Sequence, residues 1–238
     1  MKNLLSVVLL FLAACGPTYT TITVTDFLNK RIEDFSLVIA SYNNTPSITY
    51  PSGSFFGAFD HERYTKEEIE KHFIGALVEN LKQRSTFAEV CCTTYKQAPK
   101  LSPAEYDMGN MFKLQIAIPD SGTILGFEAC TADYVLLLED VTLGTYQEYS
   151  GSPGMMMGGR GLNTPPMYMN SQPRYTEKYL QYKAEFVFWD NMEGKVITYG
   201  RVRTTVRADY LNRINPEHWE QVDNEFVEEL LTGSPFIR

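Results

Sequence analysis

The sequence predicts an α/β protein of the α+β type, in which a mixed, largely antiparallel sheet is packed by two main amphipathic helices. Three observations predict this fold. Residues 66–84 and 216–231 carry apolar side chains at helical spacing. Segments rich in β-branched and aromatic residues lie before and between them. Two such segments, 132–149 and 176–190, flank a Gly-, Pro- and Met-rich stretch, which predicts a hairpin with a long insertion.

Residues 1–14 predict a secretory signal peptide that is removed. Lys2 precedes an apolar run of 11 residues, Leu4 to Ala14, that only Ser6 interrupts. A helix that spans a membrane needs about 20 apolar residues, so the run is too short to remain as an anchor. The run ends in small residues directly before a cysteine, Cys15.

The string Leu12-Ala13-Ala14-Cys15 resembles the lipobox of bacterial lipoproteins. This resemblance implies cleavage before Cys15 and a diacylglyceryl group on its sulfur, with two or three acyl chains such as palmitate in all. One chain alone binds a membrane only marginally, whereas two or three give a lasting anchor. Because Gly16 and not Asp follows, the resemblance implies the outer membrane, at its periplasmic face. An ordinary signal peptide with a coincidental cysteine is the alternative.

Composition limits the class of protein. The mature chain would have about 224 residues, enough for one domain with a sizeable core, and 20 basic against 29 acidic side chains give it a net charge of −9. This sign argues against a nucleic-acid partner, because phosphate binding requires basic patches. No second apolar run reaches 18 residues.

The elements of the domain follow in order. Residues 15–34 predict a lipidated tether or edge strand, and residues 35–238 a single domain. Residues 35–42 (FSLVIASY) predict a buried strand. The helix at 66–84 starts at a capping box formed by Thr65 and Glu68. The strand predicted at 87–95 then completes a β-α-β unit.

The second half predicts a meander that ends in a helix. Residues 99–120 are ambiguous, and residues 121–132 predict a short helix that two glycines weaken. The strand at 132–149 should lie centrally in the sheet. Residues 176–190 and 195–207 predict a hairpin. Asn215 as cap, Pro216 at the first helical position and Gly233 as stop delimit the last helix.

Four cysteines bear on the redox state. If Cys15 carries lipid, Cys91, Cys92 and Cys130 remain, and this odd number leaves at least one thiol outside an intrachain disulfide. Neighbours in a strand point to opposite faces, so only one of Cys91 and Cys92 could meet Cys130. Two states stay open: all three buried and reduced, or one structural disulfide. The spacing does not predict a zinc site.

Residues 150–175 predict a flexible Gly/Met-rich loop. It contains five methionines: Met155, Met156, Met157, Met167 and Met169. We expect either a mobile loop without a partner, or a loop that docks on a partner or a membrane. A copper(I) site is a weaker alternative, because no His or Cys accompanies the thioethers. We therefore predict no metal.

No pattern predicts catalysis. The histidines, His61, His72 and His218, lack the spacing of metal ligands, and we expect them on solvated surfaces. No nucleophile elbow, Ser-His-Asp spacing or phosphate-binding glycine string is present. We predict no catalytic residue and no cofactor other than the covalent lipid.

The layout resembles a group of small envelope lipoproteins. The order FAEV, ADYVLLLEDV, FVFWD and GKVITYG is similar to the TolB amino-terminal domain, the curli-secretion lipoprotein and the auxiliary lipoproteins of lipid-transport ABC systems. This resemblance implies the α/β fold and carries no catalytic residue. The Gly/Met insertion and the extended amino-terminal segment depart from the group.

Three functions follow as hypotheses. The first is a non-catalytic, lipid-anchored subunit or scaffold of a transport or envelope-maintenance complex, with an envelope protein or further copies of itself as partner. The second is an oligomeric outer-membrane secretion pore, in which the strands around the insertion would cross the membrane. Charged side chains that face lipid are costly, and these strands carry four of them: Glu148, Lys178, Lys183 and Glu185. The third is a periplasmic protein that binds a small ligand or a metal, or a hydrolase dependent on the histidines.

Overall fold

The computed structural model describes residues 20–41, 48–49, 66–108, 113–150, 175–208 and 214–238. Its helices are η1 (Thr25–Phe27, a 3-10 helix), α2 (Lys66–Arg84) and α3 (Pro216–Leu231). Its strands are β1 (Thr20–Thr23), β2 (Ser36–Ser41), β3 (Ile48–Thr49), β4 (Glu89–Thr94), β5 (Leu101–Asp107), β6 (Lys113–Pro119), β7 (Tyr134–Ser150), β8 (Tyr175–Asp190) and β9 (Lys195–Arg207).

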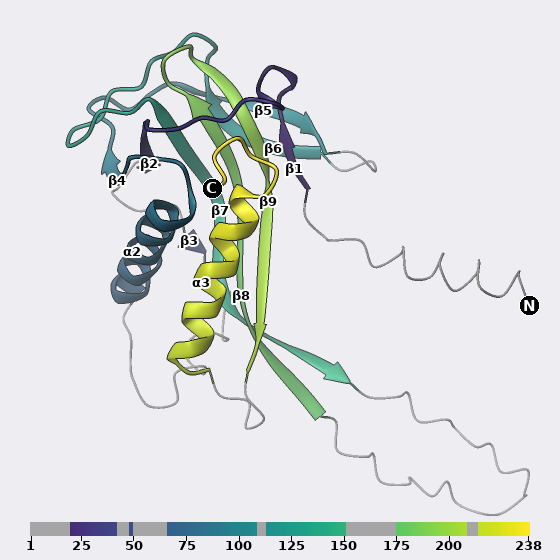
Figure 1. Cartoon of the computed structure of the whole chain (residues 1–238). Coiled ribbons are helices and arrows are strands. Elements are labelled where there is room, and N and C mark those ends of the chain that lie inside the picture. The colour runs from purple at the N-terminus through teal and green to yellow at the C-terminus, as the bar shows by residue number, and fades with distance from the viewer. Residues whose placement is uncertain (1–19, 42–47, 50–65, 109–112, 151–174, 209–213) are drawn as a thin grey trace, which may run out of the picture.

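Seven of the described strands form one mixed sheet (Figure 1). The order is β1-β9-β8-β7-β2-β4, and β3 pairs with β7 further along its length. The strands β1, β9, β8 and β7 are antiparallel, whereas β2 is parallel to both β7 and β4. The predicted α+β class with a mixed, largely antiparallel sheet is confirmed.

The β-α-β unit forms as predicted, because β2 and β4 pair in parallel and α2 connects them. Both helices have the predicted bounds. Asn215 accepts a hydrogen bond from the His218 amide at 3.2 Å, and the His218 Nδ1 accepts one from the Asn215 amide at 3.0 Å. This reciprocal cap begins α3 at Pro216. Thr65, the predicted cap of α2, lies outside the described residues.

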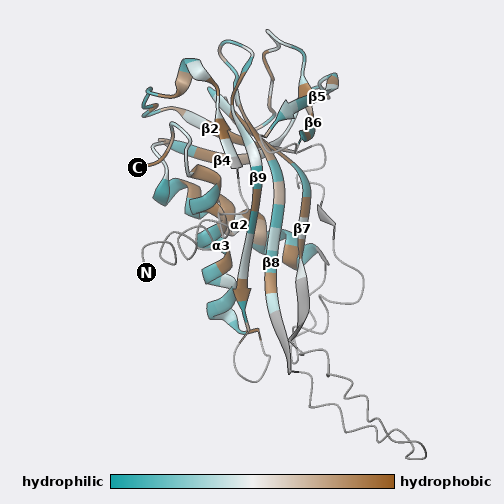
Figure 2. Ribbon diagram, turned by 90° about the vertical axis from the view of Figure 1, so that its right-hand side faces the viewer, coloured by the Kyte–Doolittle hydropathy of each residue, from teal (hydrophilic) through white to brown (hydrophobic). Residues whose placement is uncertain are grey.

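The helices α2 and α3 cover one face of the sheet and turn their apolar stripes towards it (Figure 2). From α2 come Ile69, Phe73, Leu77 and Leu81, and from α3 come Trp219, Val222, Phe226 and Leu230. They meet one face of β8, formed by the alternating residues Leu180, Tyr182, Ala184, Phe186 and Phe188. The Phe73 ring lies edge-on to Tyr182 at 5.3 Å and to Phe226 at 5.7 Å, an arrangement that adds stability beyond area burial.

The opposite face is covered by the β5–β6 hairpin, which the sequence left ambiguous, and by residues 120–132. The short helix predicted within 121–132 is wrong. This segment instead wraps around the buried side chain of Asn191. The side-chain amide of Asn191 forms hydrogen bonds of 2.7–3.0 Å with the backbone of Leu125 and Ala132. Since these bonds satisfy the backbone polar groups, a helical turn offers no advantage there.

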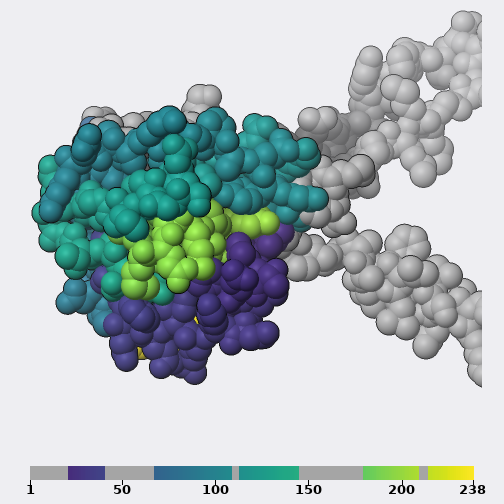
Figure 3. All heavy atoms as spheres, turned by 90° about the horizontal axis from the view of Figure 1, so that it is seen from above, coloured from purple at the N-terminus to yellow at the C-terminus, as the bar shows by residue number. Residues whose placement is uncertain are grey.

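The turn between β8 and β9 meets this segment at one end of the molecule. The Gly122 amide donates to the Gly194 carbonyl at 2.7 Å. Seen from above, the green segment around this turn lies between the purple amino-terminal segment and the teal segment that precedes β7 (Figure 3). At the other end, β7 and β8 continue past the helices (Figure 1). The Gly/Met-rich loop between them lies outside the described residues from 151 to 174.

Candidate functional site

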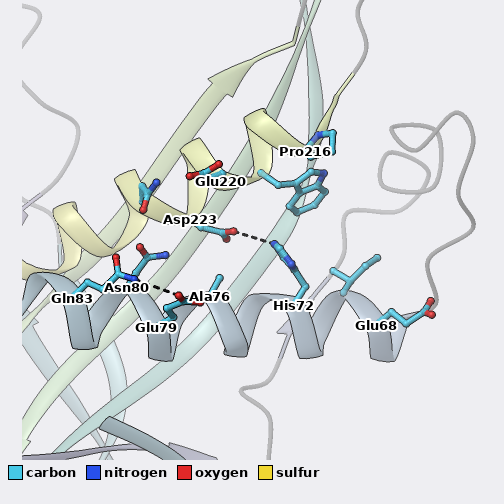
Figure 4. A pocket seen from close by; sticks show the side chains of 12 residues that line it. Glu68, His72, Ala76, Glu79, Asn80, Gln83, Pro216, Glu220 and Asp223 are labelled. Carbon is cyan, nitrogen blue, oxygen red and sulfur yellow. Dashed lines mark hydrogen bonds and ion pairs between the residues drawn. The ribbon is translucent and has the colours of Figure 1, made fainter. Parts of the chain in front are cut away.

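A concavity lies between α2 and α3, and we call it the α2–α3 groove. Its volume is about 510 Å³. Its lining from α2 comprises Glu68, Ile69, His72, Ala76, Glu79, Asn80 and Gln83, and that from α3 comprises Pro216, Trp219, Glu220, Asp223 and Asn224 (Figure 4). These positions recur every three or four residues, so each helix presents one continuous edge to the groove.

A histidine–aspartate pair joins the two helices inside the groove. The His72 Nε2 lies 3.0 Å from the Asp223 Oδ2 (Figure 4). The Asp223 side chain is only 6% exposed and that of His72 is 51% exposed, so the imidazole lies between a buried carboxylate and solvent. The His72 ring also contacts Trp219 edge-on at 5.8 Å between ring centroids.

This pair shifts the titration of the imidazole. The hydrogen bond to Asp223 raises the pKa of His72 above its ordinary value, the charge of Asp223 adds to this, and desolvation opposes it. The pair is therefore a charge-assisted contact when His72 is protonated. The expectation that this histidine lies on a solvated helix face is confirmed, because half of its side chain is exposed, while one ring nitrogen is engaged with Asp223.

A second contact ties the helices near their carboxyl-terminal ends. The Arg84 guanidinium lies 3.4 Å from the Glu228 carboxylate, and both side chains are exposed. The two helices therefore run in the same direction and are linked at two levels, His72–Asp223 and Arg84–Glu228. Between these levels the small side chain of Ala76 leaves space that a larger residue would fill.

The lining combines an acidic rim with an apolar floor. Glu68, Glu79, Glu220 and Asp223 supply carboxylates, Asn80, Gln83 and Asn224 supply amides, and the described lining contains no Lys or Arg. Ile69 and Trp219 are both buried below them. The lining also contains no Ser, Thr, Cys, Lys or Tyr that could serve as a nucleophile beside His72.

Apart from His72, the described lining contains none of the residues that the sequence singled out. Cys15, the five loop methionines and His61 fall outside the described residues, and His218 caps α3. Within the described ranges, no group of three His, Cys, Asp or Glu side chains could hold a metal ion. Asp223 was not predicted from the sequence, although a charged residue on the apolar stripe of a helix is the signal that could have found it.

The cysteines form one disulfide in the structure. Cys91 of β4 is bonded to Cys130, with 7.0 Å between their Cα atoms, and Cys92 stays reduced. Cys91 packs with the core under β5 and β6, whereas Cys92 packs against the core under the helices, so the two point to opposite faces as predicted. Burial raises the pKa of the Cys92 thiol.

Comparison with known proteins gives little. No family model and no curated protein matches the chain. Among solved structures, the chain is similar to the PelC dodecamer from Paraburkholderia phytofirmans, with 10% identity over 92% of this chain and 98% of that one and a TM-score of 0.36. A single-substitution variant of that dodecamer gives 11% identity, coverage of 91% and 95%, and a TM-score of 0.34. Likeness at this level carries no argument about function.

One further observation concerns the membrane. Within the ranges that the structure describes, no helix combines the length and the apolar character needed to cross a bilayer.

Proposed function

We propose that the chain is a lipid-anchored envelope protein without catalytic activity. In this proposal it serves as a subunit or scaffold of a transport or envelope-maintenance complex at the periplasmic face of the outer membrane. The observation that carries the proposal is the string Leu12-Ala13-Ala14-Cys15 after a short apolar run. The lipid on Cys15 would be the anchor.

The start of the sheet supports a role close to the membrane. Thr20 is paired with Arg201 at the edge of the sheet, and Cys15 lies five residues before it. Five residues span at most about 18 Å even when fully extended. A lipid on Cys15 would thus hold the first paired residue of the sheet within that distance of the bilayer surface.

The α2–α3 groove supports a role in binding. It is open to solvent, it carries polar groups on both walls, and its described lining contains no hydroxyl, thiol or amine nucleophile. A scaffold protein needs such a surface for its partner, whereas a hydrolase needs a nucleophile or an activated water as well.

The test is the variant Cys15→Ala, expressed in the native host. We expect a folded protein that is released from the membrane fraction and no longer supports the process that the wild type serves. Cys92→Ala is the matched control, because it removes a thiol but leaves the anchor in place. Full activity in the cell from a soluble Cys15→Ala protein would overturn the proposal.

An oligomeric secretion pore is the second candidate, and the length of the β7–β8 hairpin favours it. The two strands, of 17 and 16 residues, exceed the 9–11 residues with which a strand crosses a bilayer. Against it, the hairpin carries Glu148, Lys178 and Lys183. The native mass of the protein, extracted in mild detergent, separates the two functions: a large homomeric ring favours the pore, and a fixed ratio to other envelope proteins favours the subunit.

A further inference from the structure

The α2–α3 groove has the shape of a binding site for a chain segment. Two helices form its walls, and buried apolar side chains, Ile69 and Trp219, form its floor. Its volume of about 510 Å³ falls within the range of ligand sites in proteins. The contact His72–Asp223 inside the groove and the contact Arg84–Glu228 outside its lining fix the spacing of the helices before any partner arrives.

The charge of the lining selects the chemistry of the occupant. Glu79 on α2 and Glu220 on α3 stand on opposite walls, and Glu68 and Asp223 add two further carboxylates (Figure 4). The described lining contains no Lys or Arg, so His72, when it is protonated, is the one positively charged side chain within this lining. Guanidinium and ammonium groups complement such a surface, because they donate several hydrogen bonds to carboxylate and amide oxygens.

The two wall carboxylates can accept a cation. Glu79 is exposed and accepts one hydrogen bond, at 3.3 Å, from Gln83 on its own helix. Glu220 is exposed and forms no ion pair with a described residue. Both can therefore turn towards a basic side chain without breaking a contact between the helices.

We propose that the α2–α3 groove binds a basic segment of a partner protein, one that places Arg or Lys side chains between Glu79 and Glu220. This proposal rests on the function as a complex subunit and names the chemistry of its partner. The apolar floor would receive the aliphatic part of the same side chains, which bury their methylene stems while the charged ends stay at the rim.

The probe is a fluorescent hexa-arginine peptide, titrated against the full lipidated protein in detergent at low ionic strength. We expect one peptide per chain. The double variant Glu79→Gln/Glu220→Gln should bind about tenfold more weakly. The matched control, Glu89→Gln/Glu128→Gln, changes the net charge equally at exposed positions outside the groove, and its affinity should stay within about twofold of the wild type.

A second measurement locates the peptide. The chain has three histidines, so the imidazole signals of His72 can be assigned in proton NMR spectra with the variant His72→Gln. We expect these signals to shift as the peptide saturates the groove. The proposal is overturned if both double variants weaken binding equally, or if the His72 signals stay unchanged at saturation. Displacement of the peptide by one equivalent of spermidine would also overturn it, in favour of a small polyamine ligand.

Binding in this assay does not depend on the membrane anchor. Loss of function in Cys15→Ala with intact peptide binding would support both proposals. Full function in Cys15→Ala would overturn the proposal of a lipid-anchored function but would leave the proposal for the groove unaffected. Failure of the peptide assay alone would overturn only the proposal that the partner segment is basic.

Discussion

The imidazole of His72 and the buried carboxylate of Asp223 lie 3.0 Å apart and connect α2 with α3 across 151 residues of sequence. The contact raises the pKa of His72. Because the folded pKa lies above the unfolded one, the stabilisation is fully present below the unfolded value of about 6.5 and is lost as the pH rises through the folded value.

The variant Asp223→Asn tests this linkage. We expect its loss of unfolding free energy to be larger at pH 5.5 than at pH 8.5, by about 1 kcal/mol, since solvent screens the half-exposed imidazole and places the contact below the usual range for hydrogen bonds to charged groups. Glu228→Gln is the matched control, because it breaks the exposed contact between the same helices and should cost about 1 kcal/mol or less. Burial raises the pKa of Glu229 to about 7, and the charges of Glu225 and Glu228 add to this. The titration of Glu229 therefore cancels between the wild type and Asp223→Asn, but not in Glu228→Gln, which removes one of these charges. Equal losses for Asp223→Asn at the two pH values would contradict the linkage.

Two glycines offer a contrast in backbone strain. Gly194 has a φ of 66°, and a Cβ there would lie 2.4 Å from the Gly122 Cα. We expect Gly194→Ala to cost about 2 kcal/mol or more, because both the conformation and the contact become unfavourable. Gly75 lies in α2, and a Cβ added there would meet no atom within 4 Å, so Gly75→Ala should gain about 0.5–1 kcal/mol. Urea denaturation of the two variants checks both, and a neutral Gly194→Ala would show that the turn can move away.

The disulfide should stabilise the fold chiefly through the unfolded state. Cys91 and Cys130 are 39 residues apart, and closing a loop of this size contributes up to about 4 kcal/mol. We expect Cys130→Ser to lose most of this free energy and a reductant to lower the stability of the wild type to the same level. Cys92→Ala serves as control and should keep its response to the reductant. No effect of the reductant on the wild type would favour the alternative in which all three thiols are reduced.

The Gly/Met-rich loop should contribute little to stability. Replacing residues 152–172 by a short turn should change the unfolding free energy by about 1 kcal/mol or less, because the entropy of closing a loop depends only weakly on its length. The strands β7 and β8 remain paired in this variant up to their ends at Ser150 and Tyr175. Thermal and chemical unfolding measure the change. Loss of folding would show that the segment belongs to the core.

The elements that the sequence predicted well are those whose signals are local. The cap at Asn215-Pro216 and the stop at Gly233 delimit α3, and the hairpin predicted from residues 176–190 and 195–207 forms as β8 and β9. Such patterns depend on neighbours within one turn or one strand, so they can be recognised in the sequence without knowledge of the tertiary structure.

The elements that the sequence did not predict depend on distant contacts. Residues 121–132 are held by Asn191, about 60 residues away in sequence, and no local pattern announces that bond. The contact between the two walls of the groove depends on Asp223. A search for apolar periodicity does not find this residue, because such a search counts only apolar side chains. A carboxylate one turn after Trp219 and one turn before Val227 is nevertheless an irregularity in the buried stripe, and it indicates a partner on another element.

The central claim, that lipid on Cys15 anchors the protein, is tested most directly by the intact mass of the mature protein purified from its own membranes. We predict a chain that begins at Cys15, without residues 1–14, and carries the added mass of a diacylglyceryl group with its fatty acids. A chain with an unmodified Cys15, or one that begins at any other residue, would contradict it.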